Sequence, residues 1–216
     1  MTIRVLHENT QGTDYFVGDI HGCYETLMDT LHEVKFCPQK DRLICTGDLI
    51  DRGPDSAKCV ELLKESWFFS VRGNHDQFLL DGVSRGQVAI WVMNGGMWHY
   101  YLSEDELKDL YHLIDTECTT AIQVPHKGKT VGVIHANVTS GIWGEFDEER
   151  DIWDRSRTRV SEGFYQDVQG IDLVVVGHTV LDFPQKINNV LHIDTGAVFE
   201  GRKLTVMSIE EVLSYE

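Results

Sequence analysis

Three short apolar runs near the start of the chain each lead into a glycine and a polar residue, and helix-like stretches separate them. The runs cover residues 15–17, 43–45 and 67–71, and they lead to Gly18-Asp19, Gly47-Asp48 and Gly73-Asn74. Strands that alternate with helices pair in parallel. Polar side chains that follow such strands collect at the carboxyl edge of the sheet. The pattern therefore predicts an α/β fold with a functional site at that edge.

The rest of the chain predicts more helix first and more strand later. Helices are expected over 24–34 and 54–63, and the apolar spacing of 77–118 is also helical. Ser103 and Glu106 have the spacing of a capping box. Residues 138–170 are polar with weak periodicity and predict an irregular segment. Further strands are expected at 121–124, 130–134, 173–176, 190–193 and 204–209.

Composition limits the class of protein. The 216 residues, 42% of them hydrophobic, suffice for one substantial core, and no repeat or linker divides them, so we expect a single domain over 1–216. No apolar stretch could span a bilayer and the N-terminus has no continuous apolar region, which predicts no membrane partner and a cytoplasmic location. Five cysteines without a C-x-x-C pair indicate a reducing compartment. The net charge of −16 argues against binding a nucleic-acid polymer.

Five segments carry side chains of the kinds that bind metals. They are GDIHG (18–22), GDLIDRG (47–53), RGNHD (72–76), IHAN (134–137) and VGHT (176–179). Mixed imidazoles and carboxylates suit divalent manganese, iron or zinc better than calcium or magnesium. A pair of such ions is a device for hydrolysing phosphate esters. The candidate metal ligands are Asp19, His21, Asp48, Asn74, His135 and His178.

In this order, the motifs resemble those of the phosphoprotein phosphatase branch of the calcineurin-like metallophosphoesterases. The likeness is greatest to the small bacterial and bacteriophage serine/threonine phosphatases of the lambda-phosphatase type. MNGG at 93–96, IW-x-R at 152–155 and IDTGAVF at 193–199 extend the resemblance from about residue 16 to about residue 206. The resemblance implies a four-layer α/β/β/α sandwich, with a dinuclear metal site at the carboxyl ends of the strands.

The resemblance also implies a role for each matched residue. Two divalent ions, manganese first and iron or zinc next, would share Asp48, and a hydroxide that bridges them would attack phosphorus directly. Asp51 would hydrogen-bond His75, which would protonate the leaving oxygen as general acid. Arg52 and Arg155 would bind the substrate phosphate through their planar guanidinium groups. Arg72, just before the third motif, is a further candidate for phosphate binding.

The activity implied is that of a metal-dependent protein serine/threonine phosphatase, with a phosphorylated protein or peptide as substrate. Three other functions stay open: a dinucleoside polyphosphate hydrolase, a broad phosphodiesterase for small or cyclic nucleotides, and an inactive scaffold that binds a partner. A nucleoside pocket would need aromatic walls. Trp91, Trp98, Tyr100 and Tyr101 could supply them, but their helical spacing favours core packing. The sequence leaves the oligomeric state open.

Overall fold

The computed structural model describes residues 2–159 and 165–216. Its helices are α1 (Tyr24–Glu33), α2 (Ser56–Glu61), α3 (Asn74–Arg85), α4 (Val88–Met93), α5 (Glu104–Glu117), α6 (Ser156–Arg159) and α7 (Ile209–Ser214), with 3-10 turns η1 (Leu62–Lys64) and η2 (Gly96–Tyr101). Its strands are β1 (Ile3–Val5), β2 (Asp14–Val17), β3 (Arg42–Cys45), β4 (Phe68–Ser70), β5 (Ala121–His126), β6 (Lys129–Val133), β7 (Leu173–Val176), β8 (Gln185–Ile187), β9 (Val190–His192) and β10 (Val206–Ser208). Among the described residues, no helix has the length and apolar character needed to cross a membrane.

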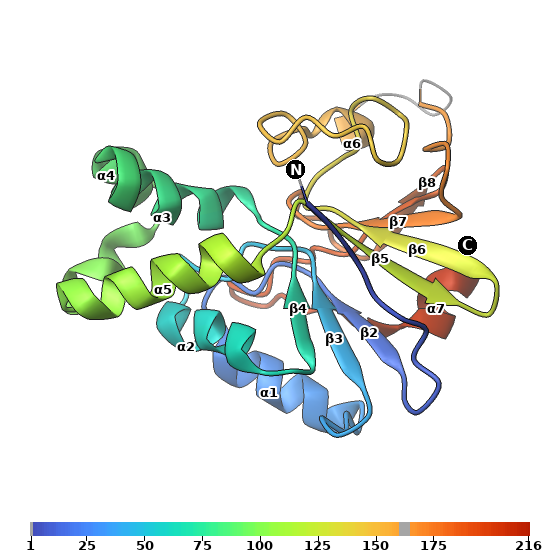
Figure 1. Cartoon of the computed structure of the whole chain (residues 1–216), viewed down its shortest axis with the longest axis horizontal. Coiled ribbons are helices and arrows are strands. Elements are labelled where there is room, and N and C mark those ends of the chain that lie inside the picture. Colours follow the sequence, from blue (N-terminus) through green and yellow to red (C-terminus); the bar gives the residue numbers. More distant parts are fainter. Residues whose placement is uncertain (1, 160–164) are drawn as a thin grey trace.

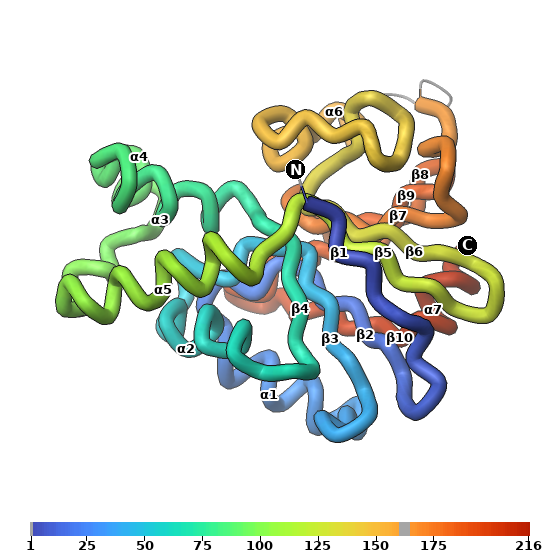
Figure 2. Tube along the Cα trace, viewed as in Figure 1, coloured from blue at the N-terminus to red at the C-terminus, as the bar shows by residue number. Residues whose placement is uncertain are grey.

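The strands form two sheets, which the traces in Figures 1 and 2 show at the centre of the molecule. The smaller sheet has the order β10-β2-β3-β4, and β2, β3 and β4 are parallel, as their alternation with helices predicts. The larger sheet has the order β1-β5-β6-β7-β9-β8, in which β6, β7 and β9 are parallel. Both sheets therefore direct the carboxyl ends of several parallel strands to one edge.

Alternating side chains divide the smaller sheet into an inner and an outer face. Phe16 and Ile44 point inward and pack with Val133, Val175 and Leu191 of the larger sheet. Their chain neighbours face the opposite way, because successive residues of a strand alternate between faces. The inner face thus builds the core between the two sheets, which is the central contact of the sandwich.

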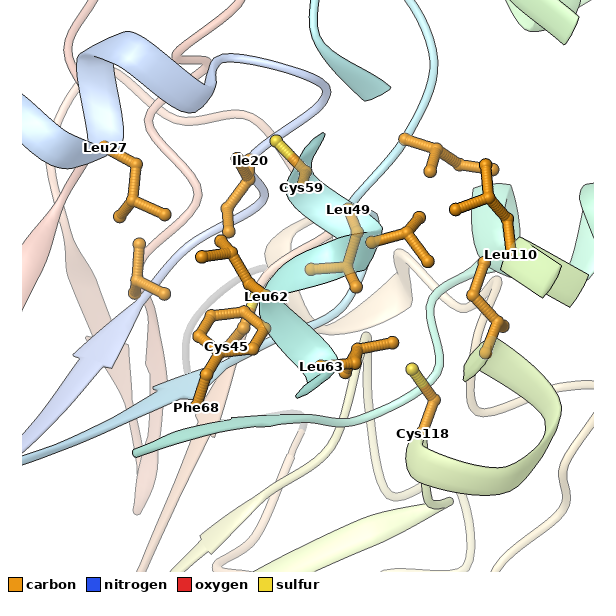
Figure 3. Packing of buried hydrophobic residues seen from close by; sticks show 14 of the residues in the cluster. Ile20, Leu27, Cys45, Leu49, Cys59, Leu62, Leu63, Phe68, Leu110 and Cys118 are labelled. Carbon is orange, nitrogen blue, oxygen red and sulfur yellow. The ribbon is translucent and has the colours of Figure 1, made fainter. Parts of the chain in front are cut away.

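Helices cover the outer face of the smaller sheet. Leu27 of α1, Cys59 of α2 and Leu110 of α5 pack with Cys45 and Phe68 of the strands, and Figure 3 shows this apolar cluster. Helix α3 also contacts α5, and α3, α4 and α5 lie together at the left of Figure 1. This layer fixes the helices whose first turns border the functional site.

The outer face of the larger sheet is covered mainly by irregular chain. Val174, Val176 and Val190 of the sheet pack against Phe146 and Val168. The only helix of residues 138–159 and 165–170 is the four-residue α6, above the sheet in Figure 1. The predicted four-layer α/β/β/α order is therefore confirmed, with a fourth layer that is mostly loop.

One expected strand is partly wrong. Residues 204–209 were expected to form a strand throughout, but β10 ends at Ser208 and α7 begins at Ile209. The Ser208 hydroxyl accepts a hydrogen bond from the Glu211 N–H at 3.3 Å, and the Glu211 carboxylate accepts one from the Ser208 N–H at 2.7 Å. This capping box starts the helix at a point where the apolar pattern alone suggests continued strand.

Candidate metal and phosphate site

Loops from both sheets meet at one edge of the sandwich. Asp19 follows β2, Asp48 follows β3 and Asn74 begins α3 after β4, whereas His135 and His178 follow β6 and β7. Two hydrogen bonds join the loops of the two sheets: the His178 N–H donates to Asp19 Oδ2 at 3.0 Å, and His135 Nδ1 lies 2.7 Å from the Thr46 carbonyl oxygen. The structure thus brings together five candidate ligands that are dispersed over much of the sequence.

The loops hold their functional residues in strained backbone. The φ angles are 46° at His21, 51° at Asp48, 74° at Asp51, 71° at Arg52 and 64° at His178. Residues other than glycine seldom adopt positive φ, and such strain gathers at functional sites. The backbone strain therefore marks the same loops as the motifs do.

Two glycines allow these loops to approach one another. A Cβ atom at Gly73 would lie 2.1 Å from Asp48 Oδ1, and one at Gly177 would lie 1.9 Å from Asp19 Oδ1. Both separations are far below van der Waals contact. Each glycine is therefore required by the carboxylate beside it.

Asp48 lies at the centre of the candidate ligands. One group of possible ligand atoms comes from His21, Asp48 and His75, and a second from Asp48, His135 and His178; within each group all atoms lie within 4.8 Å of one another. Burial alone would raise the pKa of Asp48, but the surrounding imidazoles outweigh it and lower that pKa. Asp48 is thus an ionised carboxylate common to both groups.

Asp19, which was expected among the ligands, is buried next to the two groups. Its Oδ1 accepts a hydrogen bond from the Thr46 hydroxyl at 2.9 Å. Burial, followed by the charges of Asp194 and Asp48, raises the pKa of Asp19 well above its ordinary value. Buried carboxylates this close together need compensating positive charge, which divalent cations would provide.

The hydrogen bonds of the histidines show which ring nitrogens carry the lone pairs that could bind a cation. The Nδ1 of His21 lies 2.9 Å from the Ile50 carbonyl oxygen, and the Nδ1 of His135 faces the Thr46 carbonyl oxygen. A carbonyl only accepts, so these Nδ1 atoms carry the protons and the Nε2 atoms carry lone pairs. The Nε2 of His135 then faces a second acceptor, the Asn74 Oδ1, at 3.0 Å. Two acceptors this close are a suitable arrangement for a cation.

Burial keeps these imidazoles in the form that binds metals. It lowers the pKa of His21 to about 4 and the pKa of His178 to about 3, and it also lowers the pKa of His135. All three rings are therefore neutral at pH 7, and neutral imidazole is the metal-binding form. Three imidazoles, buried carboxylates and one amide oxygen form a donor set that fits divalent manganese, iron or zinc.

His75, which is also a member of the first ligand group, and Arg52 form a polar wall beside the other candidate ligands. His75 Nδ1 lies 2.7 Å from Asp51 Oδ2, so the resemblance-based pairing of these two residues is present in the structure. The Arg52 guanidinium places Nη1 2.7 Å from His21 Nε2 and Nη2 2.7 Å from His75 Nε2. A planar cation therefore lies between a candidate metal ligand and the candidate general acid.

The other two candidate arginines lie in different surroundings. Arg155 is exposed just before α6, near enough for its charge to lower the pKa of His178 further, after burial and His135. Arg72 is half-buried and lines a groove with Gln77 and Ile152 beside α3. Among the hydrogen bonds of residues 2–159 and 165–216, none joins the Arg72 side chain to a candidate metal ligand. Arg155 thus borders the ligands, whereas Arg72 borders the groove.

Sequence reasoning gave no role to two buried aspartates of the site. The Asp76 carboxylate accepts hydrogen bonds from the Asp48 and Leu49 N–H groups at 2.9 and 3.0 Å, and thereby fixes the loop that carries Asp48. Asp194 is buried near Asp19, and its Oδ2 has no hydrogen-bond partner among the described residues. The available signals were that Asp76 ends the RGNHD motif and that Asp194 lies in the IDTGAVF match. Neither motif says what these carboxylates contact.

The expectation of core packing for four aromatic residues is half wrong. Trp91 is buried and Trp98 is half-buried, but Tyr100 and Tyr101 are 64% and 89% exposed. Both indoles also donate hydrogen bonds to Asp51, at 2.9 Å from Trp91 Nε1 and 2.7 Å from Trp98 Nε1. Helical spacing cannot separate an indole that only packs from one that also binds a buried carboxylate.

The fold and the site together define a class of protein. Two ligand groups share the Asp48 carboxylate at the edge of a two-sheet sandwich, and one of them includes His75, which is paired with Asp51 and contacts Arg52. This arrangement suits hydrolysis of a phosphate ester by two metal ions. A family model described as calcineurin-like phosphoesterase matches residues 15–182. The chain belongs to this family, whose members use a dinuclear divalent metal site.

Individual relatives agree with the family. Serine/threonine-protein phosphatase 1 of Salmonella typhimurium is 38% identical over 201 residues, which cover 91% of each chain. A symmetrical bis(5'-nucleosyl)-tetraphosphatase of Shigella dysenteriae is 48% identical, but only over 79 residues, or 34% of this chain and 28% of that protein. The crystal structure of a candidate diadenosine tetraphosphatase superposes with a TM-score of 0.62 at 24% sequence identity. The superposition covers 95% of this chain and 97% of that protein, and it shows a shared fold.

Proposed function

We propose that this phosphoesterase is a metal-dependent protein serine/threonine phosphatase that hydrolyses phosphomonoesters. The observation that carries the proposal is the pair of ligand groups that share Asp48, one of which contains His75 with its Nδ1 hydrogen-bonded to Asp51. Similarity to a serine/threonine-protein phosphatase over 91% of the chain supports the substrate class. All the chemistry lies within one domain over 1–216. The five free cysteines fit a reducing compartment, and we place the enzyme in the cytoplasm.

Six residues would hold two divalent ions, with manganese as our first choice. Bound ions of this kind lower the pKa of a water molecule and offset the charge of a phosphoryl group. Among the residues themselves, Asp48 belongs to both ligand groups, and neutral imidazoles supply nitrogen ligands without adding positive charge. The full set is Asp19, His21, Asp48, Asn74, His135 and His178.

His75 would act as general acid and protonate the leaving oxygen of the substrate. Its Nδ1 is held by Asp51, so its Nε2 faces the site and is the atom that would deliver the proton. Arg52, whose Nη2 is 2.7 Å from that Nε2, would turn to the substrate phosphate and leave Nε2 free to carry the proton, and Arg155 would bind the phosphate from the opposite wall. Arg72 would contact the substrate further along the groove beside α3.

A dinucleoside tetraphosphatase is the second candidate function. Its support is the 48% identity to such an enzyme over 79 residues. That match covers 34% of this chain, whereas the match to the protein phosphatase covers 91%, so the protein phosphatase is the better-supported choice. The inactive scaffold has less support still, because all the proposed ligands and His75 are present and His75 is paired with Asp51.

Two measurements on one preparation test this proposal. Protein stripped with a chelator should lose hydrolysis of a phosphoserine peptide, and added manganese should restore it. Full activity of protein shown to be metal-free by elemental analysis would contradict metal dependence. With manganese restored, kcat/KM should be higher for the phosphoserine peptide than for diadenosine tetraphosphate. A tenfold preference for the dinucleotide, roughly 1.4 kcal/mol of transition-state binding, would favour the second candidate function instead.

A further inference from the structure

The Asp51 carboxylate is fully buried and receives three side-chain hydrogen bonds. Asp51 Oδ2 is hydrogen-bonded to His75 Nδ1 at 2.7 Å. Asp51 Oδ1 accepts hydrogen bonds from Trp91 Nε1 at 2.9 Å and from Trp98 Nε1 at 2.7 Å. An indole N–H can only donate, so the direction of both bonds is certain. Two fixed donors on one oxygen leave the other oxygen directed at the histidine.

The two indoles are themselves held firmly. A Cβ atom at Gly96 would lie 2.4 Å from Trp91 Cδ1, and one at Gly82 would lie 2.9 Å from Trp91 Cε3, so backbone closes on the Trp91 ring from two directions. The other contacts are aromatic: Trp91 stacks on His99 with centroids 4.4 Å apart, and Trp98 meets Trp91 edge-on at 5.8 Å. Close packing of this kind holds the Trp91 ring against Asp51, and the half-buried Trp98 is positioned by its contact with Trp91.

The same segment also supports the residue next to Asp51. Gly95, between α4 and η2, has a φ of 112°, and a Cβ atom there would lie 2.9 Å from the Arg52 nitrogen and 3.0 Å from its Cγ. Asp51 and Arg52 both have left-handed backbone, which costs free energy and persists only where neighbouring structure holds it. The α4–η2 segment (88–101) therefore backs the strained turn with the two indoles and one close backbone contact.

Packing alone does not account for this arrangement. Phenylalanine rings would fill similar space without presenting polar hydrogens, whereas here both N–H groups point at one buried charge. A carboxylate that orients an imidazole needs its own orientation fixed, as in carboxylate–histidine pairs elsewhere. An Asp51 carboxylate without these donors could rotate, and the His75 ring would then lose its fixed aim.

We propose that Trp91 and Trp98 are positioning residues for His75, and that they act through the Asp51 carboxylate. This inference rests on the general-acid role of His75 in the proposed function. It adds that the α4–η2 segment (88–101) sets the geometry of proton delivery. Both indole N–H groups are directed at Asp51 and not at the open site, so their effect should follow how much the leaving group needs a proton.

Trp98→Phe is the first test. Trp98 is only half-buried, and phenylalanine keeps an aromatic ring there but removes the N–H group that donates to Asp51. We expect kcat for a phosphoserine peptide to fall roughly tenfold, the lower end of the range for such supporting contacts. Nitrophenyl phosphate, whose leaving group hardly needs a proton, should lose less than about threefold. Trp91→Phe should show the same pattern. The control is Trp143→Phe, which removes an indole hydrogen bond to Gln123 away from the site and should leave both rates unchanged.

The His75→Asn background separates positioning from loss of structure. If the indole acts through His75, Trp98→Phe should cause no further loss of peptide hydrolysis in that background. Bound manganese, measured by elemental analysis, should stay at the wild-type level in all three tryptophan variants. Equal slowing of both substrates, unchanged peptide hydrolysis, or an additive loss in the His75→Asn background would overturn the inference. Failure of the proposed function is distinct, because wild-type protein itself would then lack metal-dependent peptide hydrolysis.

Discussion

His75 is held by a carboxylate on one ring nitrogen and faces an arginine with the other. If His75 protonates the leaving oxygen, His75→Asn should lower kcat for a phosphoserine peptide by roughly 10²–10⁴-fold, the usual contribution of a general acid. The loss should be much smaller for nitrophenyl phosphate. Steady-state kinetics on both substrates, with metal content measured in parallel, checks this prediction. Asp48→Asn is the matched comparison, since it should lose bound metal itself. Loss of metal from His75→Asn, or equal effects on both leaving groups, would contradict the role.

His192 is a buried histidine outside the ligand set, and both its ring nitrogens lack hydrogen-bond partners among the described residues. Burial, followed by the charge of Arg157, lowers the pKa of His192 to about 4. A depressed histidine pKa favours the folded state above the unfolded value of about 6.5, and this contribution is lost as pH falls from there toward 4. On acidification the wild-type protein should therefore lose free energy of unfolding through His192, whereas a His192→Leu variant should not.

Thermal or urea unfolding of both proteins at pH 8 and pH 5 measures that difference. The stability of His192→Leu relative to wild type should rise by about 1–2 kcal/mol between pH 8 and pH 5. Other titrating groups are shared by the two proteins and cancel in the comparison. A relative stability that is the same at both pH values would show that His192 does not titrate differently in the folded and unfolded chains.

At the residue scale, the sequence was most informative where chemistry is confined to a short motif. All six proposed ligands and His75 lie in such motifs, and the structure gathers them at one edge. Asp194 and Trp98 were missed for a physical reason: their polar groups matter only through partners that are distant in the chain. Trp98 is 47 residues from Asp51, and no local pattern encodes that contact.

Strand ends determine how closely the functional loops can approach. Gly177, between β7 and His178, has no room for a side chain, since a Cβ atom there would lie 1.9 Å from Asp19 Oδ1 and 2.4 Å from the Thr46 hydroxyl. Gly177→Ala should therefore displace the Asp19 carboxylate and weaken manganese binding at least tenfold, roughly the lower bound for a disturbed ligand environment. Calorimetric titration of stripped protein with manganese gives the affinity.

Gly86→Ala is the control for that substitution. Gly86 ends α3 with a φ of 69° and open space around it, so alanine there meets strain but no clash. It should cost about 1–2 kcal/mol of stability through its left-handed backbone and leave manganese affinity unchanged. Wild-type affinity in Gly177→Ala would contradict the proposed place of Asp19 among the ligands.

At the element scale, prediction succeeded where a buried apolar run leads into a motif, where apolar residues have helical spacing, and where a capping box starts a helix. The parallel strands β2, β3 and β4, the helix α1 and the capping box that starts α5 were all expected. The edge strands β1 and β8 were not, because three residues with partial exposure carry too little alternation to be recognised. Of α7, only Ile209, its first residue, was wrongly expected to be strand, because the capping box that starts the helix begins at the last residue of β10.

At the scale of the whole molecule, the site exists because two sheets share an edge. Local patterns predict an α/β fold, but they do not show that the loop after β7 reaches the loop after β2. The hydrogen bond that joins these loops links His178 to Asp19, which are 159 residues apart in the sequence. The family resemblance supplied that arrangement, and the two-sheet fold agrees with it. The mostly irregular fourth layer, which carries Arg155, is the part that neither periodicity nor motifs described in detail.

The proposed centre, in which six residues from both sheets hold two ions that share Asp48, can be seen by diffraction at the manganese absorption edge from crystals of manganese-loaded wild-type protein. Two anomalous peaks should lie beside Asp48, one also next to Asp19 and His21 and the other next to Asn74, His135 and His178. A single peak, or peaks that do not include the Asp48 carboxylate, would contradict the dinuclear site on which the proposed function depends.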